Sequence, residues 1–109
     1  MKPSEILRAA KQKLIDVGWT QLTMAINKRL KPCSPELPDA HAFCAVGAIL
    51  ATRDLYPKQA IRYLQKAVQN IDGATIASVS RYNDAYYRTK QDILALYDRA
   101  IELAEEAGE

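Results

Sequence analysis

The sequence contains few cysteines and few glycines, and it has no long uninterrupted apolar run. Two cysteines, Cys33 and Cys44, are too few for a disulfide framework, so we expect both as free thiols. No stretch approaches the roughly 18 consecutive apolar residues of a membrane helix, and the first residues lack the apolar core of a signal peptide. The glycines form no phosphate-binding loop. These absences predict a soluble, cytoplasmic protein.

The net charge of +2 is unevenly distributed along the 109 residues. Residues 1–31 carry seven Lys and Arg against Glu5 and Asp16, whereas residues 92–109 carry only Arg99 against six acidic residues. Two terminal segments of opposite sign are expected to lie side by side in the fold or to pair between subunits. Because acidic residues interrupt the basic segment and the total charge is small, the composition argues against a nucleic-acid partner.

The longest segment without an internal charge, residues 40–51, predicts a buried central helix with Asp39 as its N-cap. Gly47 costs roughly 1 kcal/mol relative to Ala in a helix interior, which predicts that another backbone or ring packs against it. We therefore predict an all-α fold of four to five helices around a central helix of about residues 40–53, in a single domain spanning residues 1–109. One face of that helix is poor in side-chain volume because small residues recur at spacings of three and four: Ala40, Cys44, Gly47, Ala48 and Ala51.

Amphipathic patterns predict three further helices, from Ser4 to Gly18, from about 57 to 69, and from Thr89 to near Gly108. Ser4 is the expected N-cap of the first, and Thr89 begins the last in a capping box with Asp92. Residues 70–73 are predicted as a turn.

The remaining segments are less regular. Residues 20–30 favour a short helix, although the alternation of Leu22, Met24 and Ile26 also fits a strand. Three prolines make residues 31–38 a loop. Residues 74–80 fit either a short helix docked by Ile76 and Val79 or an extended segment, and residues 81–88 are predicted as a polar, aromatic loop.

The segment 81–92 concentrates arginines and tyrosines. In a structural interpretation, residues 83 and 84 form an Asx turn, Arg88 pairs with Asp84 or Asp92, and the tyrosine rings pack on the bundle. In a functional interpretation, the guanidinium groups and rings hold a small anionic, nucleotide-like ligand or anchor a protein partner. The candidate binding residues are Trp19, whose indole N–H needs a partner, Arg81, Tyr82, Asn83, Asp84, Tyr86, Tyr87 and Arg88.

His41 and Cys44 lie one turn apart on the predicted central helix, so they share a face. With Cys33 and Asp39 they offer metal ligands, but the spacing matches no structural zinc motif, and we expect no metal or other cofactor. The same pair, with Asp84, is the alternative to a binding function: an enzyme in which Cys44 is the nucleophile and His41 its base. His41 also has a structural alternative, a hydrogen bond to Asp84 or Asp92.

Several motifs in combination resemble a family of small uncharacterised helical domains of bacteria and phages. They are residues 43–48 (FCAVGA), Asn83-Asp84, Arg88-Thr89 and residues 92–101 (DILALYDRAI), with Gly18-Trp19 as a weaker match, and the likeness covers about residues 40–104. Two positions depart from the family pattern, since such domains tend to have Trp at the place of Tyr82 and Gly at the place of Leu22. The resemblance implies a compact helical domain that brings together Trp19, Cys44, Asn83, Asp84 and Arg88.

No activity is implied by the resemblance, but a phage setting implies host-directed binding. We therefore expect a binding module and not an enzyme. Its partner would be a host or phage protein or a small anionic ligand, and self-association into a homo-oligomer is also expected.

Overall fold

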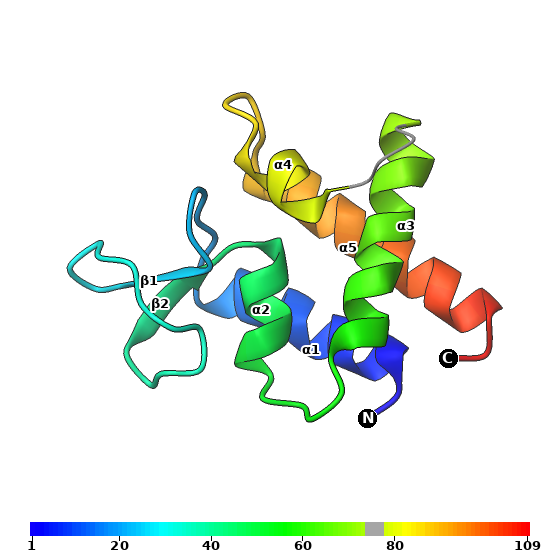
Figure 1. The fold of residues 1–109 in the computed structure, drawn as a ribbon, viewed down its shortest axis with the longest axis horizontal. Helices are drawn as coiled ribbons and strands as arrows, with labels where there is room; N and C mark the ends of the chain where they lie inside the picture. Colours follow the sequence, from blue (N-terminus) through cyan, green and yellow to red (C-terminus); the bar gives the residue numbers. More distant parts are fainter. Residues whose placement is uncertain (74–77) are drawn as a thin grey trace.

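A computed structural model describes residues 1–73 and 78–109, which form a helical bundle with one small sheet (Figure 1). This confirms the predicted mainly helical fold and adds a sheet that was not predicted. The predictions for residues 74–77, including Ile76, fall outside the described residues. The elements in chain order are α1 (Pro3–Asp16), β1 (Ala25–Asn27), β2 (Ala40–Phe43), α2 (Ala45–Ala51), α3 (Lys58–Asp72), α4 (Val79–Asp84) and α5 (Lys90–Glu106).

Helix α5 packs against both α1 and α3, and α1 packs in turn against α2. The basic and acidic terminal segments therefore lie side by side, as their charges predicted. Arg8 pairs with Glu105 at 2.7 Å, and Lys11 pairs with Asp98 at 2.6 Å. Exposed ion pairs of this kind contribute about 0–1 kcal/mol each to the free energy of unfolding, so most of the stability of the α1–α5 contact comes from its buried apolar residues.

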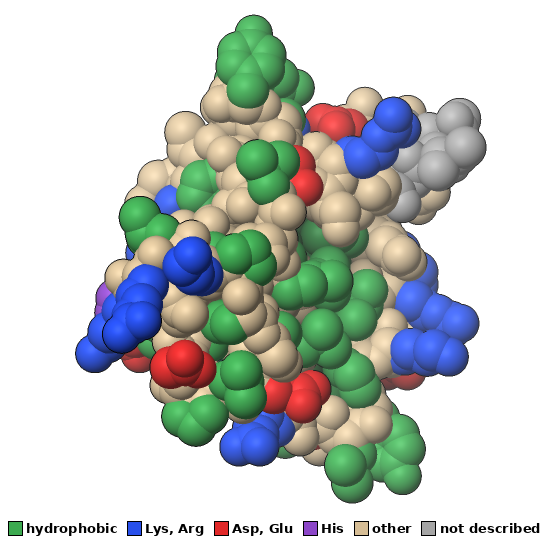
Figure 2. Space-filling model, turned by 60° about the vertical axis from the view of Figure 1, so that its left-hand side comes forward, with side chains coloured by type: hydrophobic (Ala, Val, Ile, Leu, Met, Phe, Trp, Pro, Cys, Tyr) green, Lys and Arg blue, Asp and Glu red, His purple; other side chains and the backbone are tan. Residues whose placement is uncertain are grey.

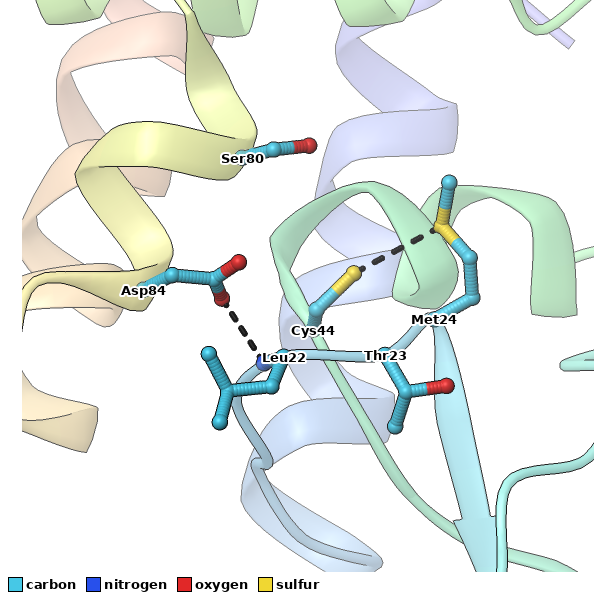
Figure 3. Close-up of a pocket in the computed structure, with 6 residues that line it drawn as sticks. All are labelled: Leu22, Thr23, Met24, Cys44, Ser80 and Asp84. Carbon is cyan, nitrogen blue, oxygen red and sulfur yellow. Dashed lines mark hydrogen bonds between the residues drawn. The ribbon is translucent and has the colours of Figure 1, made fainter.

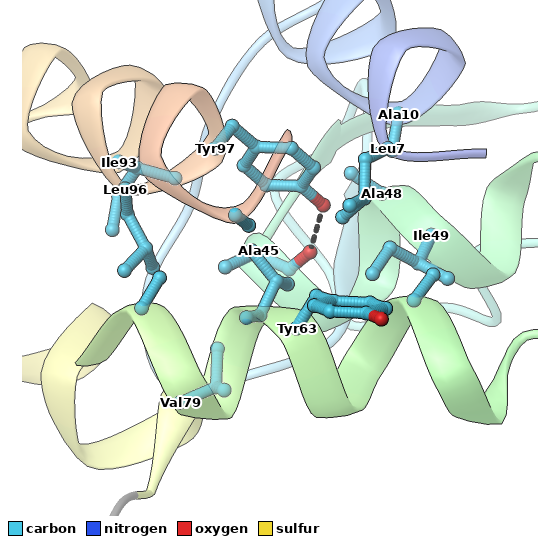
Figure 4. Close-up of a cluster of buried hydrophobic side chains, with 14 of the residues drawn as sticks. Leu7, Ala10, Ala45, Ala48, Ile49, Tyr63, Val79, Ile93, Leu96 and Tyr97 are labelled. Carbon is cyan, nitrogen blue, oxygen red and sulfur yellow. Dashed lines mark hydrogen bonds between the residues drawn. The ribbon is translucent and has the colours of Figure 1, made fainter. Parts of the chain in front are cut away.

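The apolar faces predicted from periodicity form one core (Figure 4). Burial raises the pKa of Tyr97 well above its ordinary value, because its ring lies fully inside the bundle. Its hydroxyl donates a hydrogen bond to the carbonyl oxygen of Ala45 at 2.5 Å, which ties α5 to the start of α2. The buried faces are Ile6, Leu7, Ala10 and Leu14 of α1, Ala60, Leu64, Ala67 and Val68 of α3, and Ile93, Leu96, Tyr97, Ala100, Ile101 and Ala104 of α5.

The predicted central helix of residues 40–53 is wrong in its first part, because residues 40–43 form β2 and α2 begins only after Cys44. Strand β2 pairs antiparallel with β1, Phe43 lying opposite Ala25. The predicted helix over residues 20–30 is therefore also wrong, and the alternative strand pattern is correct only for residues 25–27, which include Ile26 but neither Leu22 nor Met24. Cys44, in place of Asp39, is the N-cap, and its sulfur accepts a hydrogen bond from the Gly47 N–H at 3.2 Å.

Gly47 accounts for this arrangement, because the backbone of Met24 lies directly against it. A Cβ atom added at Gly47 would stand 2.0 Å from the Met24 carbonyl oxygen. The same oxygen accepts the Cys44 N–H at 3.0 Å. The predicted close approach to the small face of α2 is thus confirmed, and the partner is the extended segment that leads into β1.

The start of α1 and the end of α3 differ from the predictions. Helix α1 has Lys2 as its N-cap, because the Ser4 hydroxyl donates instead to the Glu109 carbonyl oxygen. Helix α3 continues through the predicted turn and ends at Gly73, which has a left-handed φ of +67°. The start of α5 is as predicted, with the Thr89 and Asp92 capping box. None of the helices in the described ranges combines the length and apolar character required to cross a membrane.

Candidate functional site

The short helix α4 occupies the first half of the predicted polar loop. Ser78 is its N-cap, the Ser78 hydroxyl oxygen accepting the Arg81 N–H at 3.2 Å. The prediction that residues 81–88 form a loop is therefore wrong for residues 81–84. The reason is the cap at Ser78, which starts a helix ahead of the segment that looked irregular. Only residues 85–88 connect α4 to α5 as a loop.

Asn83 is the hydrogen-bonding centre of this region, and its side chain is fully buried. Its side-chain oxygen accepts the Trp19 indole N–H at 2.8 Å and the Ala45 backbone N–H at 3.0 Å. Its amide nitrogen donates to the Thr20 carbonyl oxygen at 3.1 Å and to a carboxylate oxygen of Asp84 at 2.9 Å. One amide therefore joins α4 to the start of α2 and to the segment that follows α1.

The segment of residues 19–22 runs along the end of α4. The Gln21 side chain donates at 2.9 Å to two carbonyl oxygens, those of Asn83 and Ala85. The Leu22 N–H donates to Asp84 Oδ1 at 2.9 Å. These contacts fix the backbone at both the end of α4 and the beginning of its following loop.

The structural interpretation predicted that Arg88 pairs with Asp84 or Asp92, and this prediction is wrong. Its Nε donates to the Tyr82 carbonyl oxygen at 2.7 Å, and its guanidinium lies 3.5 Å from the centre of the Tyr82 ring. Burial raises the pKa of Tyr82, and the nearby Arg88 charge opposes that shift. Asp92 instead caps α5. Arg88 thus closes the loop onto α4.

The tyrosines of the segment divide into two groups. Tyr82 is buried and packs into the core, as the structural interpretation predicted. Tyr86 and Tyr87 do not pack on the bundle, because 95% and 64% of their surfaces are exposed. Their rings contact each other edge to face, with centroids 5.3 Å apart. Among the predicted binding residues, Arg81 is also exposed, while Trp19, Asp84 and Arg88 are half-buried.

Two pockets lie on opposite faces of α4. The first, of about 210 Å³, is lined by Ser80 and Asp84, which are four residues apart on one helix face (Figure 3). Its other walls are Leu22, Thr23, Met24 and Cys44. The second, of about 270 Å³, has on its α4 side Arg81 and Tyr82, with Tyr87 and Arg88 from the loop. Asp84 is thus the charged residue of the first pocket, whereas the second contains Arg81 and Arg88 together with Asp72 of α3.

The predicted pairing of His41 with Cys44 on one helix face is wrong, because the two residues lie in a strand and at a helix cap. The His41 side chain is exposed, whereas Cys44 is buried. Burial raises the pKa of the Cys44 thiol, with a smaller contribution from the Asp84 charge, and the Gly47 N–H lowers it. The thiol contacts the Met24 sulfur at 3.7 Å. Cys44 is thus placed as a structural cap, with its neutral form favoured.

The metal alternative also lacks geometric support. In residues 1–73 and 78–109, no three His, Cys, Asp or Glu side chains gather closely enough to hold a metal ion. Cys33 is half-buried and Asp39 is exposed, each at a different part of the loop before β2.

Sequence reasoning missed the residues that complete the first pocket: Leu22, Thr23, Met24 and Ser80. The spacing of Ser80 and Asp84 would have indicated a shared helix face, but only if residues 79–84 had been predicted as a helix. The approach of Met24 to Cys44 depends on long-range strand pairing, for which the local sequence carries no signal. The resemblance was informative in part: Trp19 and Asp84 share hydrogen bonds with Asn83, and Cys44 lines a pocket with Asp84, whereas Arg88 bonds the Tyr82 carbonyl oxygen and lines the second pocket.

Comparison with known proteins gives a family and no function. No curated protein and no solved structure matches the chain. The model of a family of unknown function (DUF6197) matches residues 1–103. The match agrees with the resemblance seen at residues 40–104 and extends it to the N-terminus. The chain therefore belongs to the DUF6197 family.

Proposed function

We propose that the protein is a binding module that recognises a protein partner through the loop between α4 and α5. The proposal rests on the exposure of Tyr86 and Tyr87, which lie on a loop whose backbone is fixed by hydrogen bonds from other side chains. The Asn83 and Ala85 carbonyl oxygens accept the Gln21 side chain, and Arg88 holds the other end of the loop to Tyr82. The two rings are largely exposed, and Figure 2 shows hydrophobic side chains protruding at the upper edge of the molecule, where Figure 1 places the α4–α5 loop.

Such an arrangement favours protein recognition for two physical reasons. Tyrosine and arginine are enriched among the residues that dominate interface energies, because they bury a large area and retain a polar group. A loop that is already ordered loses little conformational entropy on binding. Burying the exposed ring of Tyr86 in a partner would thus contribute affinity without reorganising the fold.

Leu22 extends this surface. Its side chain is 82% exposed, and its backbone N–H is bonded to Asp84 at the end of α4. An exposed leucine held at the end of α4 is a further apolar side chain that a partner could bury. We define the contact surface as Leu22, Tyr86 and Tyr87.

The enzyme alternative has less support. A nucleophilic cysteine needs a stabilised thiolate and a base within hydrogen-bonding reach. Cys44 instead has a raised pKa and is engaged with Gly47 and Met24, and His41 is exposed on β2.

A small anionic ligand is a second candidate, favoured by Arg88. Its guanidinium is oriented by Tyr82 but forms no ion pair with a carboxylate in the described part of the chain. Arg81 lines the same pocket. Thermal-shift measurements with nucleotides test this candidate, since a ligand that binds only the folded state raises the melting temperature. Absence of a shift far above a plausible Kd would reject it.

The main proposal is tested by affinity capture from the source organism with matched baits. The wild-type chain is expected to retain a partner that the double variant Tyr86→Ser/Tyr87→Ser loses. Tyr56→Ser is the control, because Tyr56 is 80% exposed in the α2–α3 loop, at the opposite end of the molecule from the α4–α5 loop (Figure 1). Equal retention by all three baits would contradict the proposed surface. Host-directed binding in a bacterial or phage setting stays a prediction of the family resemblance.

A further inference from the structure

The pocket beside Asp84 presents a carboxylate to a largely apolar space. Asp84 Oδ1 is occupied, since it accepts the Leu22 N–H and the Asn83 amide, each at 2.9 Å. The other carboxylate oxygen faces the space between Ser80 and Cys44 (Figure 3). No hydrogen bond to that second oxygen occurs among the described residues. The site therefore has one anionic acceptor, fixed in direction by the two bonds to its partner oxygen.

The remaining walls suit an aliphatic chain. Leu22 and Met24 line the pocket with apolar atoms, and Cys44 contributes a thiol whose raised pKa favours the neutral form. The Ser80 hydroxyl is a second polar group, on the same face of α4 as Asp84. Among residues 1–73 and 78–109, no Lys or Arg lines the pocket. A ligand that matches these walls carries a positive charge at the end of a short apolar stem.

A primary ammonium fits this acceptor geometry better than a guanidinium. Arginine binds carboxylates most strongly in a planar, two-point arrangement that uses both oxygens. Here Oδ1 is already engaged, so only one oxygen is available. A lysine ammonium is a compact charge with three donors, which a single carboxylate oxygen and a hydroxyl can share.

We infer that this pocket binds a primary alkylammonium group, and that in the complex it receives a lysine side chain of the protein partner. The second part rests on the proposed function, because the pocket adjoins Leu22 of the contact surface. The first part is independent of any partner and is tested on the protein alone.

The test is an NMR titration of the ¹⁵N-labelled full chain with n-butylammonium. We expect saturable shifts of the amide signals of Leu22, Ser80 and Asp84. Two comparison ligands are each expected to bind at least about tenfold more weakly than n-butylammonium. n-Butanol has the alkyl stem without the charge, and n-propylguanidinium carries its charge on a planar group. Nα-acetyl-lysine N-methylamide is expected to shift the same signals as n-butylammonium, as a lysine within a peptide would.

Asp84→Asn is the decisive variant. Its carbonyl oxygen can still accept from Leu22 and Asn83, while an NH₂ group replaces the oxygen that faces the pocket. We expect n-butylammonium binding to weaken about tenfold or more. Asp72→Asn, an exposed carboxylate in the second pocket, is the matched control and should bind as the wild type does. Should Asp84→Asn fail to fold, Ser80→Ala serves instead, with an expected loss of several-fold.

Three results would overturn the inference: no saturable shift with the wild type, equal binding by Asp84→Asn, or binding of n-butanol or n-propylguanidinium as tight as that of n-butylammonium. Since these titrations contain no partner, they do not bear on capture through Tyr86 and Tyr87. Conversely, loss of the partner in the tyrosine variant leaves the ammonium titration unchanged. The two proposals therefore fail separately.

Discussion

The indole N–H of Trp19 donates to the side-chain oxygen of Asn83 at 2.8 Å, joining residues 64 positions apart. The same oxygen accepts the backbone N–H of Ala45 at the start of α2. Because Asn83 is completely buried, water cannot replace these bonds. This amide is therefore a buried polar link from α4 to both α2 and the segment after α1, in addition to the bonds that Gln21 and Leu22 make at the end of α4.

Asn83→Ala should therefore be among the most destabilising substitutions in the chain. It leaves the Trp19 and Ala45 N–H groups without an acceptor, and unsatisfied buried groups cost about 1–3 kcal/mol each. We expect a loss of roughly 2–4 kcal/mol in the free energy of unfolding, measured by urea denaturation. Asn70→Ala is the control, because Asn70 is exposed and its side chain accepts a hydrogen bond from the exposed Arg99 side chain. Similar small losses for both would show that the amide does not organise the site.

Gly47→Ala tests the contact between α2 and the Met24 backbone. By helix propensity alone, alanine would stabilise α2 by roughly 1 kcal/mol. The added Cβ would instead stand 2.0 Å from a backbone oxygen, which cannot rotate away. We expect the variant to lose about 2 kcal/mol or more and to show altered amide signals for Met24 and Cys44.

Gly108→Ala is the matched control, since no other atom lies within 4 Å of its added Cβ and its φ is +74°. Its free energy of unfolding should fall only by the cost of placing alanine in a left-handed backbone conformation, about 1 kcal/mol. A stabilised Gly47→Ala variant would mean that the Met24 segment does not lie against α2.

The differences between predicted and observed structure follow from the range of the interactions involved. Helices α1, α3 and α5 were predictable because their apolar spacing and the Thr89 cap are local signals. Strand β2 was not, since residues 40–43 (AHAF) fit a helix equally well until β1 pairs with them. At the site, the family motifs grouped Trp19, Asn83 and Asp84, which are hydrogen-bonded together, but they did not indicate that Tyr82 is buried and Tyr86 exposed. The orientation of each tyrosine ring depends on tertiary packing, so local sequence patterns do not predict it.

Leu22 offers a prediction with opposite signs for stability and binding. Its φ is +71°, a left-handed conformation that leucine rarely adopts, and its side chain is 82% exposed. This is the position at which the resembling domains tend to have glycine. Leu22→Gly should relieve the strain and stabilise the fold by up to about 1 kcal/mol, measured as a rise in the urea midpoint. If Leu22 belongs to the contact surface, partner capture should weaken in the same variant.

Leu37→Gly separates strain from exposure. Leu37 is 49% exposed and is not among the non-glycine residues with positive φ. At residue 37 a glycine only increases the conformational entropy of the unfolded chain, so we expect the free energy of unfolding to fall by about 0.5–1 kcal/mol. Destabilisation of Leu22→Gly by the same amount would show that the backbone at residue 22 is not strained.

Cys44 should react slowly with alkylating agents. Only the thiolate is nucleophilic, and burial raises the pKa of this thiol, so little thiolate forms near neutral pH. With Cys33→Ser removing the other thiol, iodoacetamide should modify the native protein more slowly than an unstructured cysteine peptide, and at the peptide rate once urea has unfolded it.

Because the folded-state pKa is raised, the stability linked to the neutral thiol is present below the ordinary thiol pKa and is lost as pH rises through the folded value. Native alkylation should accelerate over that same alkaline range. Alkylation at neutral pH faster than the peptide rate would instead indicate a stabilised thiolate, and would favour an enzyme using Cys44 over a binding module.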